Sequence, residues 1–195
     1  MLKDLLWLIQ FKRNLNKMKK HYLFIISATK KDFAHYQSQH VFTDYQQEEI
    51  EFHLNRMQDF YTKIDKMGFF QASITQNKEF QSYIGLFKKN LLSCNEILML
   101  GARRELLLFS QDMDFLINNK THNLFMHLSP EIQNTFKKIY DLTNNAIKSI
   151  DEKNLLHFAE CKYTLDLLLT KIHNLLSPQK YDKLFQELTK LQEHH

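Results

Sequence analysis

Apolar side chains recur every three or four residues along most of the chain, a spacing that places them on one face of successive helices. The first predicted helix runs from Leu2 to about Thr29, and the polar stretch Lys30 to His40 follows it. Its apolar positions alternate spacings of three and four residues: Leu8, Phe11, Leu15, Met18, Tyr22 and Ile25. The sequence therefore predicts a long amphipathic helix at the start of the chain.

A second predicted helix begins after Thr43, where Gln46 three residues later completes a capping box. It ends near Gly68, because glycine commonly follows the last turn of a helix. Its apolar positions follow a heptad pattern: Ile50, Leu54, Met57, Tyr61 and Ile64.

A third predicted helix runs from about Thr75 to Asn118 and contains two glycines, Gly85 and Gly101. A glycine inside a helix costs about 1 kcal/mol relative to alanine. The two glycines therefore indicate either a kink or a close contact with a neighbouring element.

The phrase Leu-Ser-Pro occurs twice, at residues 128–130 and 176–178, and each time it separates two apolar-periodic segments. Serine is a preferred N-cap and proline is tolerated at the first helical position. Helices are therefore expected at about 130–150 and 152–176, the latter capped by Asp151, with a short last helix from Ser177. The residues expected at the centre of the core are Phe136, Leu168 and Leu108.

Composition favours an all-α fold, since three glycines and two prolines in 195 residues leave little material for hairpin turns. The length suits one domain of ordinary size or two small ones that share a core, and the 44% of hydrophobic residues can form a large core. No window reaches the roughly 18 to 20 uninterrupted apolar residues of a membrane span. The short apolar run Leu5 to Ile9 is not expected to be a signal peptide. The expected location is cytoplasmic, with association to a membrane as the alternative.

Positive charge is concentrated at the start of the chain. Residues 1–31 hold eight Lys or Arg and one Asp, a net charge of +7 against +4 for the whole chain. A basic helix can bind an anionic membrane surface or nucleic acid, or it can be an ordinary solvated face. The candidate membrane or partner surface consists of Lys12, Arg13, Lys17, Lys19 and Lys20.

Catalytic motifs are missing from the sequence, which has no paired cysteines at zinc spacing, no His-Glu-x-x-His and no glycine-rich phosphate loop. The best metal candidate is the pair Glu49 and His53, which is also common on solvated helix surfaces. Cys94 and Cys161 are expected to be small core residues in a reducing compartment. The sequence therefore predicts no catalytic residues, no cofactor and no metal.

Clustered aromatic residues have two interpretations. Phe69 with Phe70, and Phe33 with Tyr36, could form platforms on which nucleic-acid bases stack. Core filling between helices is the interpretation that the sequence favours.

The second half of the chain resembles the PhoU family in two segments, residues 145–160 and 166–172. The first reads Asn-Ala-Ile-Lys-Ser-Ile-Asp-Glu-Lys-Asn-Leu-Leu-His-Phe-Ala-Glu, and the second is a helix that begins at Asp166 and leads to Leu-Ser. The similarity is greatest to the cytoplasmic domain of bacterial sodium–phosphate cotransporter relatives. It implies one antiparallel six-helix bundle of two three-helix repeats, at about residues 5–120 and 125–195.

The family's metal-binding carboxylates are only partly matched. Where the family has Asp-Leu-Glu-Arg-Ile-Gly-Asp, this chain reads Glu96-Ile-Leu-Met-Leu-Gly-Ala, with Leu98 and Ala102 at two carboxylate positions. Where the family has Glu-x-x-x-Asp, Lys162 replaces the glutamate. Hard or borderline metals need several oxygen ligands, so the resemblance implies a site that has lost its metal.

Two functional hypotheses follow. The first is a non-catalytic regulatory or interaction domain linked to phosphate transport or signalling, which binds a membrane transporter, its own dimer mate or an anionic membrane surface. The second is an unrelated helical adaptor that binds nucleic acid or a protein through the basic first helix. Nucleic acid is the less favoured partner. A chain order of three helices followed by three superposable helices would support the first hypothesis.

Overall fold

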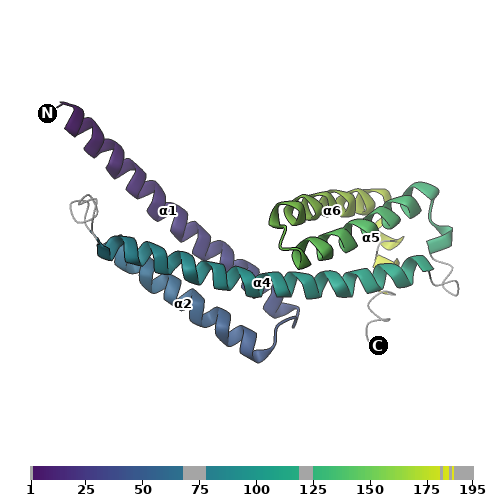
Figure 1. Ribbon diagram of the computed structural model, residues 1–195. Helices are drawn as coiled ribbons and strands as arrows, with labels where there is room; N and C mark the ends of the chain where they lie inside the picture. Colours follow the sequence, from purple (N-terminus) through teal and green to yellow (C-terminus); the bar gives the residue numbers. More distant parts are fainter. Residues whose placement is uncertain (1, 68–77, 119–124, 181, 185, 187–195) are drawn as a thin grey trace. The chain divides into compact units, whose positions relative to one another are not determined.

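The computed structural model describes the backbone of residues 2–67, 78–118, 125–180, 182–184 and 186. Every element in these ranges is helical (Figure 1). The elements in chain order are α1 (Leu2–Ser38), α2 (Asp44–Lys66), α4 (Lys78–Asn118), the short 3-10 helix η1 (Phe125–His127), α5 (Pro130–Asp151) and α6 (Leu155–Leu175). The predicted all-α fold class is therefore confirmed.

The chain divides into two compact units, residues 1–101 and 102–195, and α4 contributes to both of them. The two repeats expected at about residues 5–120 and 125–195 stay a prediction. Each unit has a core of its own.

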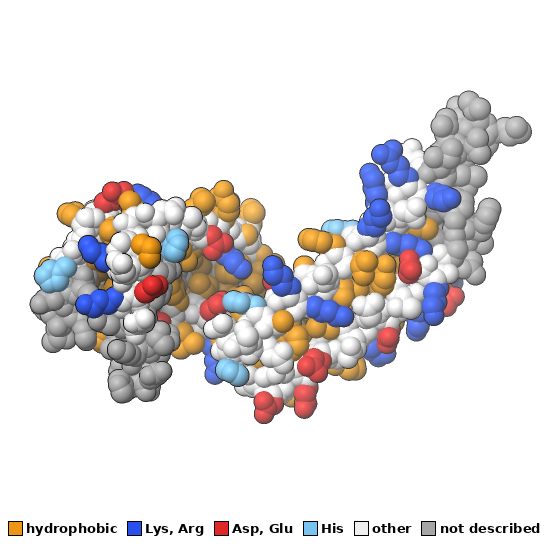
Figure 2. Space-filling model, turned by 180° about the vertical axis from the view of Figure 1, so that it is seen from behind, with side chains coloured by type: hydrophobic (Ala, Val, Ile, Leu, Met, Phe, Trp, Pro, Cys, Tyr) orange, Lys and Arg blue, Asp and Glu red, His pale blue; other side chains and the backbone are white. Residues whose placement is uncertain are grey.

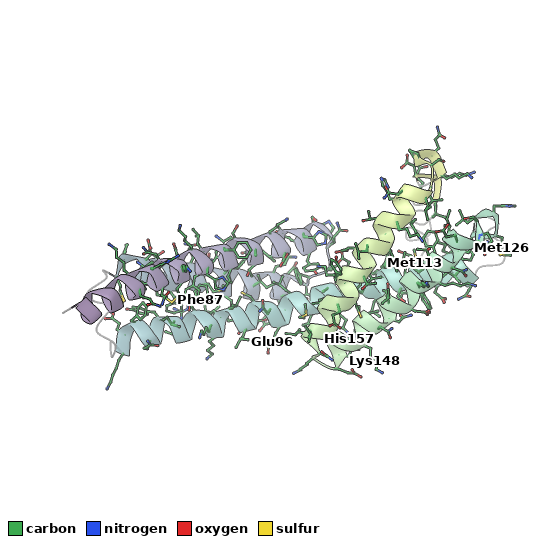
Figure 3. The ribbon with its side chains drawn as sticks, turned by 90° about the horizontal axis from the view of Figure 1, so that it is seen from above. Phe87, Glu96, Met113, Met126, Lys148 and His157 are labelled. Carbon is green, nitrogen blue, oxygen red and sulfur yellow. The ribbon has the colours of Figure 1, made fainter. Side chains whose placement is uncertain are left out.

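In the first unit, α1 and α2 are antiparallel neighbours. Near the turn, the Gln37 side-chain amide donates to Oε1 of Gln47 over 3.1 Å, and far from it Lys19 contacts Asp65. On α4, Phe87, labelled in Figure 3, stacks on Tyr22 of α1 with ring centroids 4.4 Å apart. Large apolar side chains from all three helices therefore share one core.

Helix α1 is longer than the sequence predicts, since the expected end is near Thr29 and the helix continues to Ser38, through most of the polar stretch Lys30 to His40. The buried residues of α1 follow one stripe with spacings of three, four and seven: Leu15, Tyr22, Ile26, Thr29, Phe33 and Tyr36. Polar residues on either side of this pair, among them Lys31, Asp32 and Gln37, are exposed. Phe33 and Tyr36 are buried, so the core-filling interpretation is confirmed for this pair, whereas Phe69 and Phe70 lie outside the described residues.

Local signals at the start of α2 and α5 are confirmed. The Thr43 hydroxyl accepts from the Gln46 N–H, and the Gln46 side chain accepts from the Thr43 N–H over 3.0 Å. Ser129 caps α5 by accepting from the Ile132 N–H, and Pro130 occupies the first helical turn. At the second Leu-Ser-Pro phrase, the Ser177 hydroxyl accepts from the Lys180 N–H over 3.4 Å. Gly68, expected to end α2, lies outside the described residues.

The N-cap of α6 was predicted at the wrong residue. Asp151 is the last residue of α5, and Asn154 caps α6 by accepting from the His157 N–H over 3.2 Å. Between them, Lys153 adopts a left-handed backbone conformation with φ 56°, which turns the chain sharply. Asp151 instead binds Arg103, whose Nε and Nη2 atoms lie 2.6 and 3.2 Å from the two carboxylate oxygens.

In the second unit, α5 and α6 lie side by side and the latter part of α4 packs on α5 (Figure 1). The Ser110 hydroxyl of α4 donates to Oδ1 of Asn144 of α5 over 2.8 Å, while Lys171 of α6 pairs with Glu131 of α5 over 2.8 Å. The core between these helices is lined by buried apolar side chains: Met113, Leu116, Ile132, Phe136, Ile139, Phe158, Leu165 and Ile172.

Of the three residues expected at the centre of the core, Phe136 is fully buried and Leu168 is half-buried. Leu108 was predicted wrongly, since 49% of its surface is exposed. Leu108 shares a heptad register with the buried residues Phe87 and Cys94, since residues 87, 94, 101 and 108 are each seven apart. In the second unit α4 instead buries Ser110, Met113 and Leu116, so the seam does not continue through Leu108.

Candidate interaction surface

The solvent side of α1 carries a regular row of cations. Arg13, Lys17, Lys20 and Lys31 are all exposed, and successive members are four, three and eleven residues apart. Positions three, four, seven and eleven residues apart fall on one side of a helix. The buried residues Tyr22 and Ile26 lie on the opposite side, so these cations point away from the core of the first unit.

An aromatic side chain lies within this row. Phe24 follows Lys20 by four residues and precedes Lys31 by seven, and 68% of its surface is exposed. We call the set Arg13, Lys17, Lys20, Phe24 and Lys31 the basic face of α1. Its neighbour Leu23 is also 49% exposed. Figure 2 shows Lys and Arg side chains gathered beside the grey N-terminal residues.

Lys19, one of the five predicted surface residues, has a different role. Its ammonium group donates to the backbone oxygen of Asp65 over 2.7 Å and lies 3.5 Å from the Asp65 carboxylate. Only 16% of its side chain is exposed. A cation at the carbonyl end of a helix is favourable, so the contacts of Lys19 stabilise the packing of the end of α2 on α1. The other four predicted residues, Lys12, Arg13, Lys17 and Lys20, are exposed.

Phe24 is the residue of this surface that the sequence analysis missed. A signal was available, because Phe24 is offset by two residues from both Tyr22 and Ile26 and by four from Lys20. That register places it among the cations and away from the apolar stripe.

Two cations of α2, Arg56 and Lys63, contact aromatic rings. The Arg56 guanidinium carbon lies 5.4 Å from the Phe52 ring centroid and 5.9 Å from that of Phe60. The Lys63 ammonium lies 5.7 and 5.3 Å from the centroids of Phe60 and Tyr83. Such cation–π contacts already engage these charges inside the unit. The exposed cations of α1 are the better candidates for a partner.

The metal candidate His53 is held by a neighbour within the first unit. Its Nδ1 atom lies 2.8 Å from Oδ1 of Asn90, and the Asn90 amide donates to the Leu86 carbonyl over 2.7 Å. Because the Asn90 amide nitrogen donates to Leu86, the atom that faces His53 is the amide oxygen, which can only accept a hydrogen bond. Nδ1 of His53 is therefore the donor and is unavailable to a metal. Within the described ranges, no group of three or more His, Cys, Asp or Glu is placed to hold a metal ion.

One arrangement on α6 has the residue types of a nucleophile, a base and an orienting acid. Sγ of Cys161 lies 3.8 Å from Nε2 of His157, whose Nδ1 atom lies 3.5 Å from Oε2 of Glu160. This arrangement was not predicted from the sequence, although its signal is the run His-x-x-Glu-Cys. Nucleophilic catalysis needs an accessible thiolate.

Neither cysteine meets that requirement. Cys161 is buried, and desolvation followed by the charge of Glu160 raises the pKa of its thiol. Burial also raises the pKa of the Cys94 thiol, to about 11, and its Sγ lies 3.9 Å from Sδ of Met57. Both thiols are therefore protonated at neutral pH, as expected of the core residues that the sequence predicted.

None of the helices, over the residues that the structure describes, combines the length and apolar character needed to cross a bilayer. Comparisons of the chain with protein-family models, with curated proteins and with solved structures gave no significant match.

Proposed function

We propose that this protein is a non-catalytic interaction module that attaches to an anionic membrane surface through the basic face of α1. The observation that carries the proposal is the exposure of Phe24 among Lys17, Lys20 and Lys31 on a helix whose other side is packed. Helices that lie at a membrane interface combine basic residues with exposed aromatic or apolar side chains.

The expected strength of attachment follows from the charges. Each Lys or Arg near an anionic surface contributes about 1 kcal/mol, so the four cations of the basic face give a weak and reversible attachment. Solvent-exposed charges are screened within about 8 Å at physiological salt. Binding should therefore weaken steeply as the salt concentration rises.

The link to phosphate transport or signalling comes from the PhoU resemblance alone. The family's carboxylate positions are occupied by Leu98, Ala102 and Lys162, of which the first two are buried and the third is exposed. A module without these ligands would act by contact and not through bound metal. If the protein serves phosphate transport, the membrane to which it attaches would be the one that contains the transporter.

The test compares sedimentation of the full chain with vesicles of phosphatidylcholine alone and with vesicles that also contain about one-third phosphatidylserine, at low and physiological salt. We expect binding to the anionic vesicles only. A variant with Lys17→Glu and Lys20→Glu should lose it, and Phe24→Ser should weaken it. The matched control is Lys137→Glu with Lys138→Glu, two exposed cations of α5 that carry the same change in charge.

Nucleic acid is the alternative partner, and it would produce a similar salt dependence. The same variants are therefore tested on single-stranded and duplex DNA by fluorescence anisotropy. Tight DNA binding without vesicle binding would contradict the proposal in favour of a nucleic-acid adaptor. Equal vesicle binding by the Lys17/Lys20 and Lys137/Lys138 variants would show that attachment does not depend on the basic face.

A further inference from the structure

Helix α6 is apolar on two sides. One side packs in the core of the second unit and contributes Phe158, Cys161, Leu165 and Ile172, all of them buried. The other side exposes Leu156, Tyr163 and Leu167, with 74%, 68% and 53% of their surfaces open to solvent. A surface helix of a monomer ordinarily carries polar residues opposite its buried side.

The three exposed residues form one stripe. Leu156, Tyr163 and Leu167 are seven and four residues apart, so their side chains lie above one another on the same face. The buried residues Phe158 and Leu165 are offset by two residues from members of this set, and Ile172 follows Leu165 by seven residues, so all three lie on the opposite face. We call Leu156, Tyr163 and Leu167 the outer stripe of α6. Contiguous exposed apolar side chains of this kind mark an interaction surface.

The charges beside the outer stripe indicate the kind of partner. Lys162 and Asp166 lie along one edge, and Glu160 and Lys171 along the other, so each edge carries one charge of each sign. This balance gives no attraction to an anionic membrane or to nucleic acid, in contrast to the basic face of α1. It suits another helix with a mixed pattern of charges.

We propose that the outer stripe of α6 pairs with the same stripe of a second copy of this chain, with the two helices antiparallel. A twofold axis near Leu165 places Tyr163 of one copy against Leu167 of the other. In a twofold-related antiparallel pair, each edge of a helix faces the same edge of its partner. Lys162 of one copy therefore faces Asp166 of the other, and Glu160 faces Lys171, so the surface is self-complementary.

The two edges do not contribute equally. Lys171 already pairs with Glu131 of α5 over 2.8 Å, and Glu160 lies 3.5 Å from Nδ1 of His157. The edge of Lys162 and Asp166 therefore provides the cleaner test of orientation. A parallel pair would not bring this edge to face itself.

The experiment measures the mass of the full chain by sedimentation equilibrium over a range of concentrations. We expect a dimer whose dissociation constant lies in the micromolar range. Tyr163→Glu should make the chain monomeric by burying a charge in the stripe. The matched control is Met126→Glu, which places the same charge at an equally exposed apolar residue of the same unit, 70% open to solvent. It should leave the dimer unchanged.

Orientation is tested by charge reversal. Lys162→Glu and Asp166→Lys should each raise the dissociation constant about fivefold or more, and the double variant should restore it. Circular dichroism confirms that each variant is folded. A wild-type chain that is monomeric up to about 200 µM overturns the proposal, as does a dimer that survives Tyr163→Glu. Failure of the double variant to restore dimerisation overturns the antiparallel arrangement.

Discussion

The ring of Phe42 occupies the space where any side chain at residue 101 would begin. A Cβ atom built on Gly101 would lie 2.6 Å from Cε1 and 2.8 Å from Cζ of Phe42, and 3.3 Å from Cγ of Tyr36. These distances are shorter than carbon–carbon van der Waals contact. Phe42 has little room to move, since its ring lies 5.8 Å from that of Tyr36 and 6.0 Å from that of Phe33. Gly101 is therefore required for close packing of α4 on the turn between α1 and α2.

We expect Gly101→Ala to destabilise the protein. Alanine gains about 1 kcal/mol in helix propensity, but forcing extra volume into a packed site costs about 1–3 kcal/mol. Gly85→Ala is the matched control on the same helix, because a Cβ atom there meets nothing within 4 Å. It should stabilise the protein by about 0.5–1 kcal/mol. Denaturant unfolding followed by circular dichroism measures both, and a stabilising Gly101→Ala would contradict the packing argument.

Lys19 and Lys20 are neighbours in sequence with opposite expected roles. Lys19→Met removes the contacts to Asp65 and should lower the free energy of unfolding by about 1 kcal/mol, since the interaction is charge-assisted and partly exposed. Lys20 is exposed, so Lys20→Met should change stability by less than about 0.5 kcal/mol. Denaturant melts of the two variants, together with vesicle binding, separate the roles. Equal stability of the two variants would show that Lys19 does not fasten α2.

Capping sites were the part of the fold most readily predicted from sequence. Thr43 with Gln46, and Ser129 with Pro130, act on backbone groups within one turn of themselves, so their effect does not depend on distant residues. The end of α1 was not predictable in this way. Lys30 to His40 is mostly polar, and only the burial of Phe33 and Tyr36 against Phe42 shows that the helix continues.

The candidate surface on α1 was likewise predictable only in part. The positive charge of α1 follows from composition and was predicted. The separation of Lys19 from the basic face depends on where α2 ends, a contact between residues 46 positions apart. The predicted burial of Leu108 was wrong for a similar reason. Packing on α5 decides which side of α4 is buried beyond Gly101.

Core truncations should follow burial and not the heptad pattern. Phe136 is fully buried, so Phe136→Ala should cost about 3–5 kcal/mol through lost transfer free energy and a residual cavity. Leu108→Ala should cost less than about 1 kcal/mol, because half of that side chain is already exposed. Chemical denaturation of the two single variants tests the ranking, and a larger loss for Leu108→Ala would reverse the assignment of the core.

Metal binding gives a further prediction. Leu98 and Ala102 are buried apolar residues at positions where the resembling family has carboxylates, and Glu96, labelled in Figure 3, is exposed. We expect protein purified without chelator to contain no stoichiometric iron or zinc. Elemental analysis by mass spectrometry provides the measurement. One or more metal ions per chain, lost on dialysis against a chelator, would refute the prediction.

The raised pKa of the Cys94 thiol, about 11 against an ordinary value near 9, makes stability depend on alkaline pH. Burial disfavours the thiolate in the folded state, so between pH 9 and pH 11 the unfolded chain binds fewer protons than the folded chain. The contribution of the Cys94 thiol to the free energy of unfolding is therefore fully present below pH 9. It is lost as the pH rises, by about 2–3 kcal/mol by pH 11.

Cys94→Ala isolates this contribution from other groups that titrate in the same range. Tyr22, whose pKa is also raised by burial, is present in both proteins, so its effect cancels in the comparison. Wild type should be more stable than the variant at pH 8, because alanine leaves a small cavity. The difference should shrink or change sign by pH 11 in urea unfolding experiments. A difference that stays constant from pH 8 to pH 11 would show that the Cys94 thiol titrates alike in the folded and unfolded chains.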